Sequence, residues 1–143
     1  MPYSSQDVVL DRECDPVFDP LMQLAVMRQN NVHTFEKPWG RYTDYFRSKS
    51  CVFKTIEVDP GHRLSLQTHA KRDEVWYVIS GSGIVTVGYE TKHLVTGRRV
   101  EICRGQQHRL ENTGEVFLIV AEMQCGDCDE DDIERLEDDY KRA

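Results

Sequence analysis

Apolar and polar residues alternate with a period of two along most of the chain from His33 onward, and this period is typical of β-strands. The expected strands lie at 41–46, 51–58, 74–79, 84–87, 92–95, 98–103 and 116–123. Glycine turns such as Gly81-Ser82-Gly83 and Thr96-Gly97 separate them. Many short strands with glycine turns predict an all-β fold, an antiparallel sandwich or barrel.

A helical period precedes the strands. Asp19-Pro20 is typical of an N-cap followed by a proline at the first helical position, and the helix should end by Asn30-Asn31. The apolar residues at three-to-four spacing are Leu21, Met22, Leu24, Ala25 and Met27. A helix of barely three turns is marginal alone, so it should pack on the main domain or on another subunit. We therefore expect an N-terminal helical arm at 1–31, a barrel at 32–125 and an acidic C-terminal tail at 126–143.

Charge is concentrated in that tail. The 143 residues carry a formal charge of −7, and residues 127–143 hold nine acidic and three basic side chains, a net −6. We expect 127–132 to form a solvated lid or a helix start, with Ile133 and Leu136 as anchors. The chain has no Lys/Arg cluster with interleaved aromatics, which argues against nucleic acid. It has no apolar run of membrane length and no secretory signal, so we expect a cytoplasmic protein without a membrane partner.

Five cysteines, an odd number, are expected to be reduced thiols. Cys125-Gly126-Asp127-Cys128 is the one spacing that could be half of a zinc site or a redox pair. Because no second cysteine pair of suitable spacing accompanies it, we interpret both residues as ordinary thiols.

The strongest chemical signal is a set of four possible metal ligands. Gln67 and His69 are two residues apart, so they project from one face of a strand, and a turn at 70–73 could fold Glu74 back beside them. His108 follows a second glycine turn and would be the fourth donor. A mixed nitrogen and oxygen set suits one divalent ion, zinc first, with manganese, cobalt, iron or nickel as alternatives.

Two motifs in this region resemble those of the cupin superfamily of jelly-roll barrels. The first runs from Gly61 to Gly81 and the second from Gly97 to Asn112, and both meet the family's spacing. Gln67 stands in the usual first-histidine place and Cys103 in the usual proline place. The resemblance implies a single-domain double-stranded β-helix that holds the metal inside the barrel.

A narrower resemblance covers roughly residues 32–142. The chain is similar there to the C-terminal domain of the bifunctional mannose-1-phosphate guanylyltransferase/mannose-6-phosphate isomerases. The segments that carry the similarity are 37–42, 52–56, 60–69, 72–76, 108–112 and 130–133 with Asp139-Tyr140. It implies a metal-dependent isomerase that interconverts mannose 6-phosphate and fructose 6-phosphate. With no guanylyltransferase domain or glycine-rich nucleotide loop in the sequence, we expect no nucleotidyl transfer, and Val75 departs from the family histidine that follows the motif glutamate.

The resemblance also suggests roles for single residues. Arg72 matches a family arginine thought to serve catalysis, and Glu74 joins it as a catalytic candidate. Lys54 and Arg109 match family cations that could bind phosphate or the enediolate. The general base stays open between Glu74, Glu111 and a metal-bound hydroxide.

Two alternatives to the isomerase remain: a metal-holding cupin that binds a sugar or sugar phosphate without turnover, and a small cupin dioxygenase. We interpret Trp39 and Trp76 as core residues rather than sugar platforms. A homodimer is expected because the barrel has edge strands and the chain has a short helix.

Overall fold

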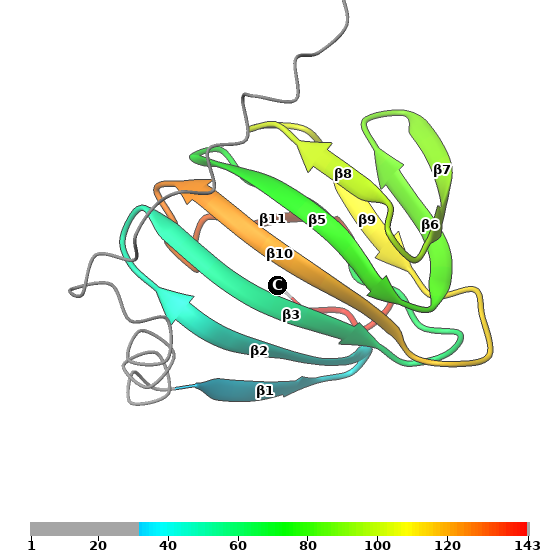
Figure 1. Cartoon of the computed structure of the whole chain (residues 1–143). Helices are drawn as coiled ribbons and strands as arrows, with labels where there is room; N and C mark the ends of the chain where they lie inside the picture. The colour runs from blue at the N-terminus through cyan, green and yellow to red at the C-terminus, as the bar shows by residue number, and fades with distance from the viewer. Residues whose placement is uncertain (1–31, 143) are drawn as a thin grey trace, which may run out of the picture.

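The computed structural model describes residues 32–142, which form eleven β-strands and no helix (Figure 1). The strands are β1 (His33–Lys37), β2 (Gly40–Arg47), β3 (Cys51–Val58), β4 (Leu66–Thr68), β5 (Arg72–Ser80), β6 (Ser82–Val87), β7 (Glu90–Val95), β8 (Arg99–Ile102), β9 (His108–Glu111), β10 (Leu118–Gly126) and β11 (Glu134–Glu137). The all-β prediction is therefore confirmed for these residues. The predicted helix at 19–30 and the arm at 1–31 lie outside the described residues.

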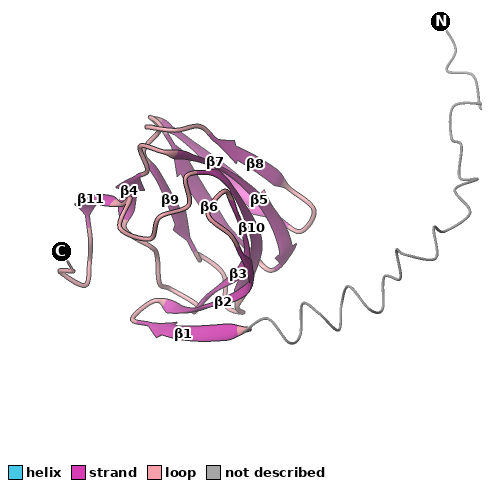
Figure 2. Ribbon diagram, turned by 90° about the vertical axis from the view of Figure 1, so that its left-hand side faces the viewer, coloured by secondary structure: helices cyan, strands magenta, loops and turns pink. Residues whose placement is uncertain are grey.

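The strands form two antiparallel sheets that face each other as two layers (Figure 2). One sheet has the order β1-β2-β3-β10-β5-β8 and the other the order β11-β4-β9-β6-β7. Each sheet also joins strands that are distant in sequence, since β10 pairs with both β3 and β5, and β11 pairs with β4. This crossing of the chain between two sheets is the jelly-roll arrangement expected of a cupin.

Residues that line the inside of the barrel are apolar toward one end and polar toward the other. The inward residues, polar first, are Arg72, Glu74, Trp76 and Val78 on β5 and Gln124, Glu122, Val120 and Leu118 on β10, all of them buried. In register, Val120 lies opposite Val78, and Gln124 lies opposite Glu74. Full burial of one Val or Leu side chain stabilises a fold by about 1.5–3 kcal/mol. The apolar end therefore holds the sheets together, and the polar end is where chemistry can take place.

Both tryptophans pack in the core, and Trp39 also lines the cavity described below. Trp76 is 1% exposed and Trp39 is 5% exposed, and both pack in one cluster with Ile56, Val58 and Leu110. The alternation predicted for 51–58 is also confirmed, because every second side chain of β3 from Val52 onward is buried.

A glycine closes the first motif for a steric reason. Gly81 joins β5 to β6 with φ at +88°, a conformation that side-chain-bearing residues rarely adopt. A Cβ atom there would lie 2.4 Å from the carbonyl oxygen of Phe117. Only glycine allows the turn and the close approach together.

The acidic tail contains a strand that the sequence did not predict. Residues 127–132 form turns and irregular structure rather than the start of a helix, and residues 134–137 form β11, which pairs with β4 in the barrel wall. Leu136 is 45% exposed and does not anchor it. The acidic composition concealed a strand whose pairing partners on β4 lie 66 or more residues earlier in the chain.

No helix long and apolar enough to cross a membrane occurs in the part of the chain that the structure describes.

Candidate metal centre and its cavity

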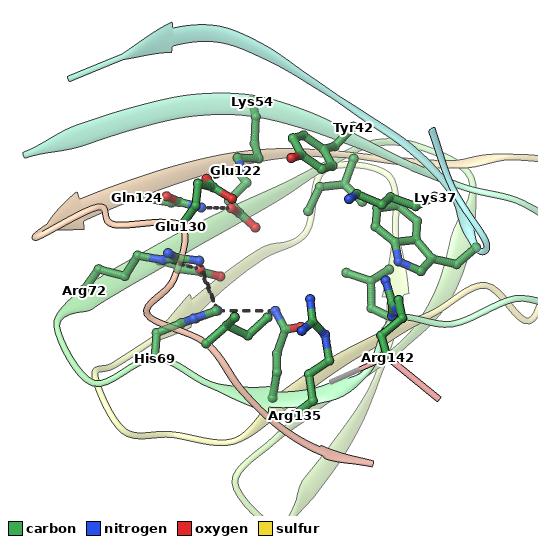
Figure 3. A pocket seen from close by; sticks show the side chains of 16 residues that line it. Lys37, Tyr42, Lys54, His69, Arg72, Glu122, Gln124, Glu130, Arg135 and Arg142 are labelled. Atoms are coloured by element: carbon green, nitrogen blue, oxygen red, sulfur yellow. Dashed lines mark hydrogen bonds and ion pairs between the residues drawn. The ribbon is translucent and has the colours of Figure 1, made fainter. Parts of the chain in front are cut away.

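The polar end of the barrel encloses a cavity of about 120 Å³ (Figure 3). Its walls come from β1, β2, β3, β5 and β10 of one sheet and from β4, β11 and their flanking residues of the other. A larger hollow of about 920 Å³ lies between the β6–β7 hairpin and β8, and it is lined by none of the predicted ligands. The candidate site is therefore the smaller cavity.

His69, Glu74 and His108 converge beside this cavity. One ligand atom from each lies within 4.8 Å of the other two, and all three side chains are buried. Nε2 of His69 is 3.2 Å from Oε1 of Glu74, and Nε2 of His108 is 3.5 Å from Oε2 of the same carboxylate. Two imidazole nitrogens thus face one carboxylate, as the spacing of the motifs predicted.

Backbone carbonyls orient both imidazole rings. Nδ1 of His69 donates to the carbonyl oxygen of Asp132 at 2.6 Å, and Nδ1 of His108 donates to that of Gln106 at 3.0 Å. With the hydrogen on Nδ1, the lone pair of each Nε2 points to the site. Burial lowers the pKa of His69 to about 4, helped by the nearby Arg72, and burial also lowers the pKa of His108. Both rings are therefore neutral ligands at neutral pH.

Gln67 lies on the same side. In register it is opposite His108, and its Nε2 is 3.3 Å from Nε2 of His69, while its Oε1 accepts from the Ser65 hydroxyl at 2.7 Å. Rotating the terminal amide by 180° would turn Oε1 toward His69 and leave Nε2 to donate to Ser65. The four predicted ligand residues are thus neighbours.

This donor set fits a divalent transition metal. Nε2 of His108 is buried and has no hydrogen-bond partner within the described residues, and an orphaned buried nitrogen is costly unless something binds it. Two imidazoles, one carboxylate and one amide oxygen are ligands that zinc, manganese, cobalt and iron accept. The residues do not distinguish among these ions.

Arg72 is the cation next to this set. Its Nε donates to Oε1 of Glu74 at 3.0 Å, and its Nη2 lies 3.2 Å from Nε2 of His69. Nη1 donates to the carbonyl oxygen of Asp129 at 3.3 Å. The guanidinium is buried, is held on three sides and lines the cavity, and its catalytic role stays a prediction.

A second buried carboxyl, Glu122, was missed at the sequence level. The indole Nε1 of Trp76 donates to Oε2 of Glu74 at 3.2 Å and to Oε2 of Glu122 at 2.9 Å, so it lies between the two acids. Gln124 donates to the other oxygen of Glu122 at 2.6 Å. Burial, together with the charge of Glu74, raises the pKa of Glu122. The available signal was its position, two residues after Val120 on the inward face of the most apolar strand.

Of the two residues predicted to bind the substrate, Lys54 lines the cavity and Arg109 does not. Lys54 lines the cavity, with Nζ 3.5 Å from Oδ1 of Asp44 and 3.5 Å from Oε1 of Glu130. Arg109 does not line it: its Nε donates to the carbonyl oxygen of Leu64 at 3.0 Å and its Nη1 to Glu137 at 3.0 Å. His108 and Leu110 use the inward positions of β9, so Arg109 between them points the other way. The structure therefore does not support Arg109 as a substrate ligand.

Three further cations line the cavity and were not predicted: Lys37, Arg135 and Arg142. Cys125 is exposed and Cys128 is buried, and neither lines the cavity.

The fold is shared with solved cupin-type structures. A protein with a double-stranded β-helix domain from Klebsiella pneumoniae superposes with a TM-score of 0.61 at 19% identity, over 76% of this chain and 89% of that one. The capsular polysaccharide assembling protein CapF from Staphylococcus aureus superposes with a TM-score of 0.65 at 20% identity, over 76% of this chain and 35% of that one. The predicted cupin fold is thereby confirmed.

Sequence comparison is more specific. The alginate biosynthesis protein AlgA of Pseudomonas aeruginosa is 42% identical over 116 residues, which are 80% of this chain and 24% of that protein. The mannose-1-phosphate guanylyltransferase ManC of Salmonella typhimurium is 38% identical over 108 residues, 75% of this chain and 22% of that protein. The chain thus spans about a quarter of the length of these relatives. The family described as mannose-6-phosphate isomerase C-terminal matches residues 25–138, and the chain belongs to this family.

Proposed function

We propose that this protein is a metal-dependent isomerase that interconverts mannose 6-phosphate and fructose 6-phosphate. The observation that carries the proposal is the convergence of His69, Glu74 and His108 at one end of a cavity that also holds a buried arginine and a second buried carboxyl. Membership of the mannose-6-phosphate isomerase C-terminal family supports the choice of substrate.

The reaction moves one proton from C2 to C1 and a second from O2 to O1, and no atom is lost. Gln67, His69, Glu74 and His108 would hold the divalent ion, which supplies a Lewis acid for the carbonyl and hydroxyl oxygens of the sugar. Arg72 is placed to stabilise the negative charge that develops on these oxygens, because its guanidinium already lies beside Glu74 and His69.

Glu122 is the residue that we propose as the proton carrier between C2 and C1. Its carboxyl lines the cavity and is not part of the ligand set, whereas Glu74 is. A raised pKa brings a carboxylic acid nearer to the working pH, which favours proton transfer in both directions. Glu111, the other candidate, is not among the residues that line the cavity.

Two of the departures from the family motifs, Val75 and Cys103, lie outside the cavity. Val75 lies between the inward Glu74 and Trp76, so its side chain is on the outer face of β5. Cys103 is exposed and outside the cavity. Neither substitution removes a group from the site, which supports turnover over a binding-only cupin or a dioxygenase.

The test is a coupled assay that follows fructose 6-phosphate production from mannose 6-phosphate, with zinc, cobalt or manganese added to chelator-treated protein. We expect turnover that depends on the metal, that is lost in Gln67→Ala/His69→Ala and that persists in the exposed control His93→Ala. Saturable binding without turnover, whatever the metal, would instead support the non-catalytic cupin. The homodimer stays a prediction for light scattering.

A further inference from the structure

A group of positive side chains lines the cavity outside the set of candidate metal ligands. Five cations line the cavity, and two of them, Lys54 and Arg72, are bonded to the carboxylates of its interior. Lys37 and Arg142 lie on the side of the cavity opposite His69 and Arg72, and Arg135 lies between that side and His69 (Figure 3). We call these three residues the cationic mouth.

Arg142 is held in place before any ligand arrives. Its Nε donates to Oδ2 of Asp138 at 2.9 Å and its Nη2 to Oδ1 at 2.8 Å, and the guanidinium lies over the Tyr140 ring at 5.4 Å from the ring centroid. These bonds lower the pKa of Asp138 to about 2, so the pair stays charged. The guanidinium edge that carries Nη1 makes neither of these bonds, and a fixed arginine loses little freedom when it binds an anion.

Arg135 and Lys37 complete the mouth from two different edges of the barrel. Arg135 is on β11, opposite Gln67 in register, so one strand pair links a cation to a metal-ligand residue. Lys37 is the last residue of β1, exposed, with Nζ 5.5 Å from the centroid of the Tyr42 ring. Three cations from β1, β11 and the residues after β11 therefore face one space.

An apolar part of the cavity wall suits the body of a small sugar. Trp39, Ile56, Leu64 and Ile133 line it together with Tyr42. A ligand that spans the cavity would place oxygens at the metal end, a ring or carbon chain against this wall, and its anionic group at the mouth. Lys54 does not serve that group well, since two carboxylates already lie 3.5 Å from its Nζ.

We propose that Lys37, Arg135 and Arg142 form the subsite for the phosphate monoester of the substrate. The inference rests on the proposed function for the identity of the sugar, but the subsite itself requires only a phosphate dianion. A phosphate monoester carries a charge of about −1.5 to −2 and three acceptor oxygens, which matches several cations better than a neutral sugar or a single carboxylate does.

The test is a calorimetric titration of the full chain with mannose 6-phosphate, inorganic phosphate and mannose. We expect mannose 6-phosphate to bind more tightly than mannose, and inorganic phosphate to compete with it. Lys37→Met and Arg135→Gln should each weaken mannose 6-phosphate binding by about tenfold or more. Arg99→Gln, a change at an exposed ion pair on β8 that does not line the cavity, should leave the affinity unchanged.

Lys37→Met is the leading variant because an exposed strand end tolerates the change, whereas Arg142→Gln would leave Asp138 unpaired. Metal analysis of each variant shows that the other end of the cavity is intact. Unchanged affinity in both Lys37→Met and Arg135→Gln overturns the subsite, as does equal binding of mannose and mannose 6-phosphate. This measurement needs no turnover. If the protein is inactive but shows the expected binding pattern, the phosphate subsite stands and the isomerase activity is overturned. If the protein is active and KM is unaltered in both variants, the isomerase activity stands and the subsite is overturned.

Discussion

His69 and His108 present the same ring nitrogen to the same carboxylate, yet different parts of the chain hold them. The carbonyl that orients His108 belongs to Gln106, two residues earlier in the same loop. The carbonyl that orients His69 belongs to Asp132, 63 residues away in the C-terminal segment. One ligand is set by its own loop, and the other depends on a distant segment.

The distant support is attached at several points. The Asp132 carboxylate accepts from the backbone N–H groups of Ala70 at 3.0 Å and Lys71 at 2.8 Å, directly after His69. The carbonyl of Asp129 accepts from Arg72. The segment that composition describes as an acidic tail therefore supports the His69 side of the candidate metal centre, and its acidity is used in specific bonds.

The largest expected effect comes from removing either ligand. His69→Ala and His108→Ala should each reduce metal affinity by more than the roughly 10–100-fold that is typical for the loss of an outer-shell partner. Elemental analysis of protein purified without chelator measures this loss, with His93→Ala as a folded surface control and circular dichroism as a check on folding. If a variant keeps stoichiometric metal, the histidine it lacks is not a metal ligand, and the comparison of His69 with His108 no longer holds.

A smaller and unequal effect is expected from the two supports. Asp132→Ala removes both bonds to the turn after His69 and should weaken metal binding by about tenfold. Gln106→Ala removes one side-chain bond, from the Cys103 N–H at 2.8 Å, while the local turn keeps its backbone bond.

We therefore expect Gln106→Ala to stay within about threefold of the wild type, well below the usual range for an outer-shell partner. Competition with a chromophoric chelator measures both affinities. Equal losses in the two variants would show that the distant support matters no more than the local one.

The smallest effect on metal affinity is expected from substitution of Glu122, which touches neither the Asp132 support nor the Gln106 support. Burial raises the pKa of Glu122. In metal-free protein, the contribution of this carboxyl to the free energy of unfolding therefore falls as pH rises above its pKa in the unfolded chain, near 4.5. Glu122→Gln should raise the melting temperature by a few degrees at pH 8, with a smaller gain at pH 5. The Oε1 of Gln124, buried without a hydrogen-bond partner among the described residues, is available to accept from the new amide.

Thermal melts in chelator at the two pH values test this prediction, and chelator competition should show metal affinity near that of the wild type. A variant that melts below the wild type at pH 8 would mean that the charged carboxylate stabilises the cavity.

Local periodicity was enough to predict which side chains of each strand face inward, but not which strands are neighbours in the sheets. Gln67, His69, Glu74 and His108 could be predicted because each motif fixes its own spacing. The alternation of β10 could show that Glu122 faces inward, but not that Glu122 and Arg135 reach the same cavity, since β10 and β11 meet their partners only through pairings across the barrel. Arg109 could have been excluded by parity alone, because an inward His108 makes its neighbour face outward.

The pairing of β11 with β4 also orders events in time. During synthesis, His69 and His108 leave the ribosome before Asp132 does. All the proposed metal-ligating side chains therefore exist before the carbonyl of Asp132 can orient the His69 ring. Contacts between such distant segments form late, because a long loop must close before they stabilise anything. A chain that stops short of residue 132 would carry every donor and still hold one imidazole loosely, so tight metal binding would report that the last strand has been added.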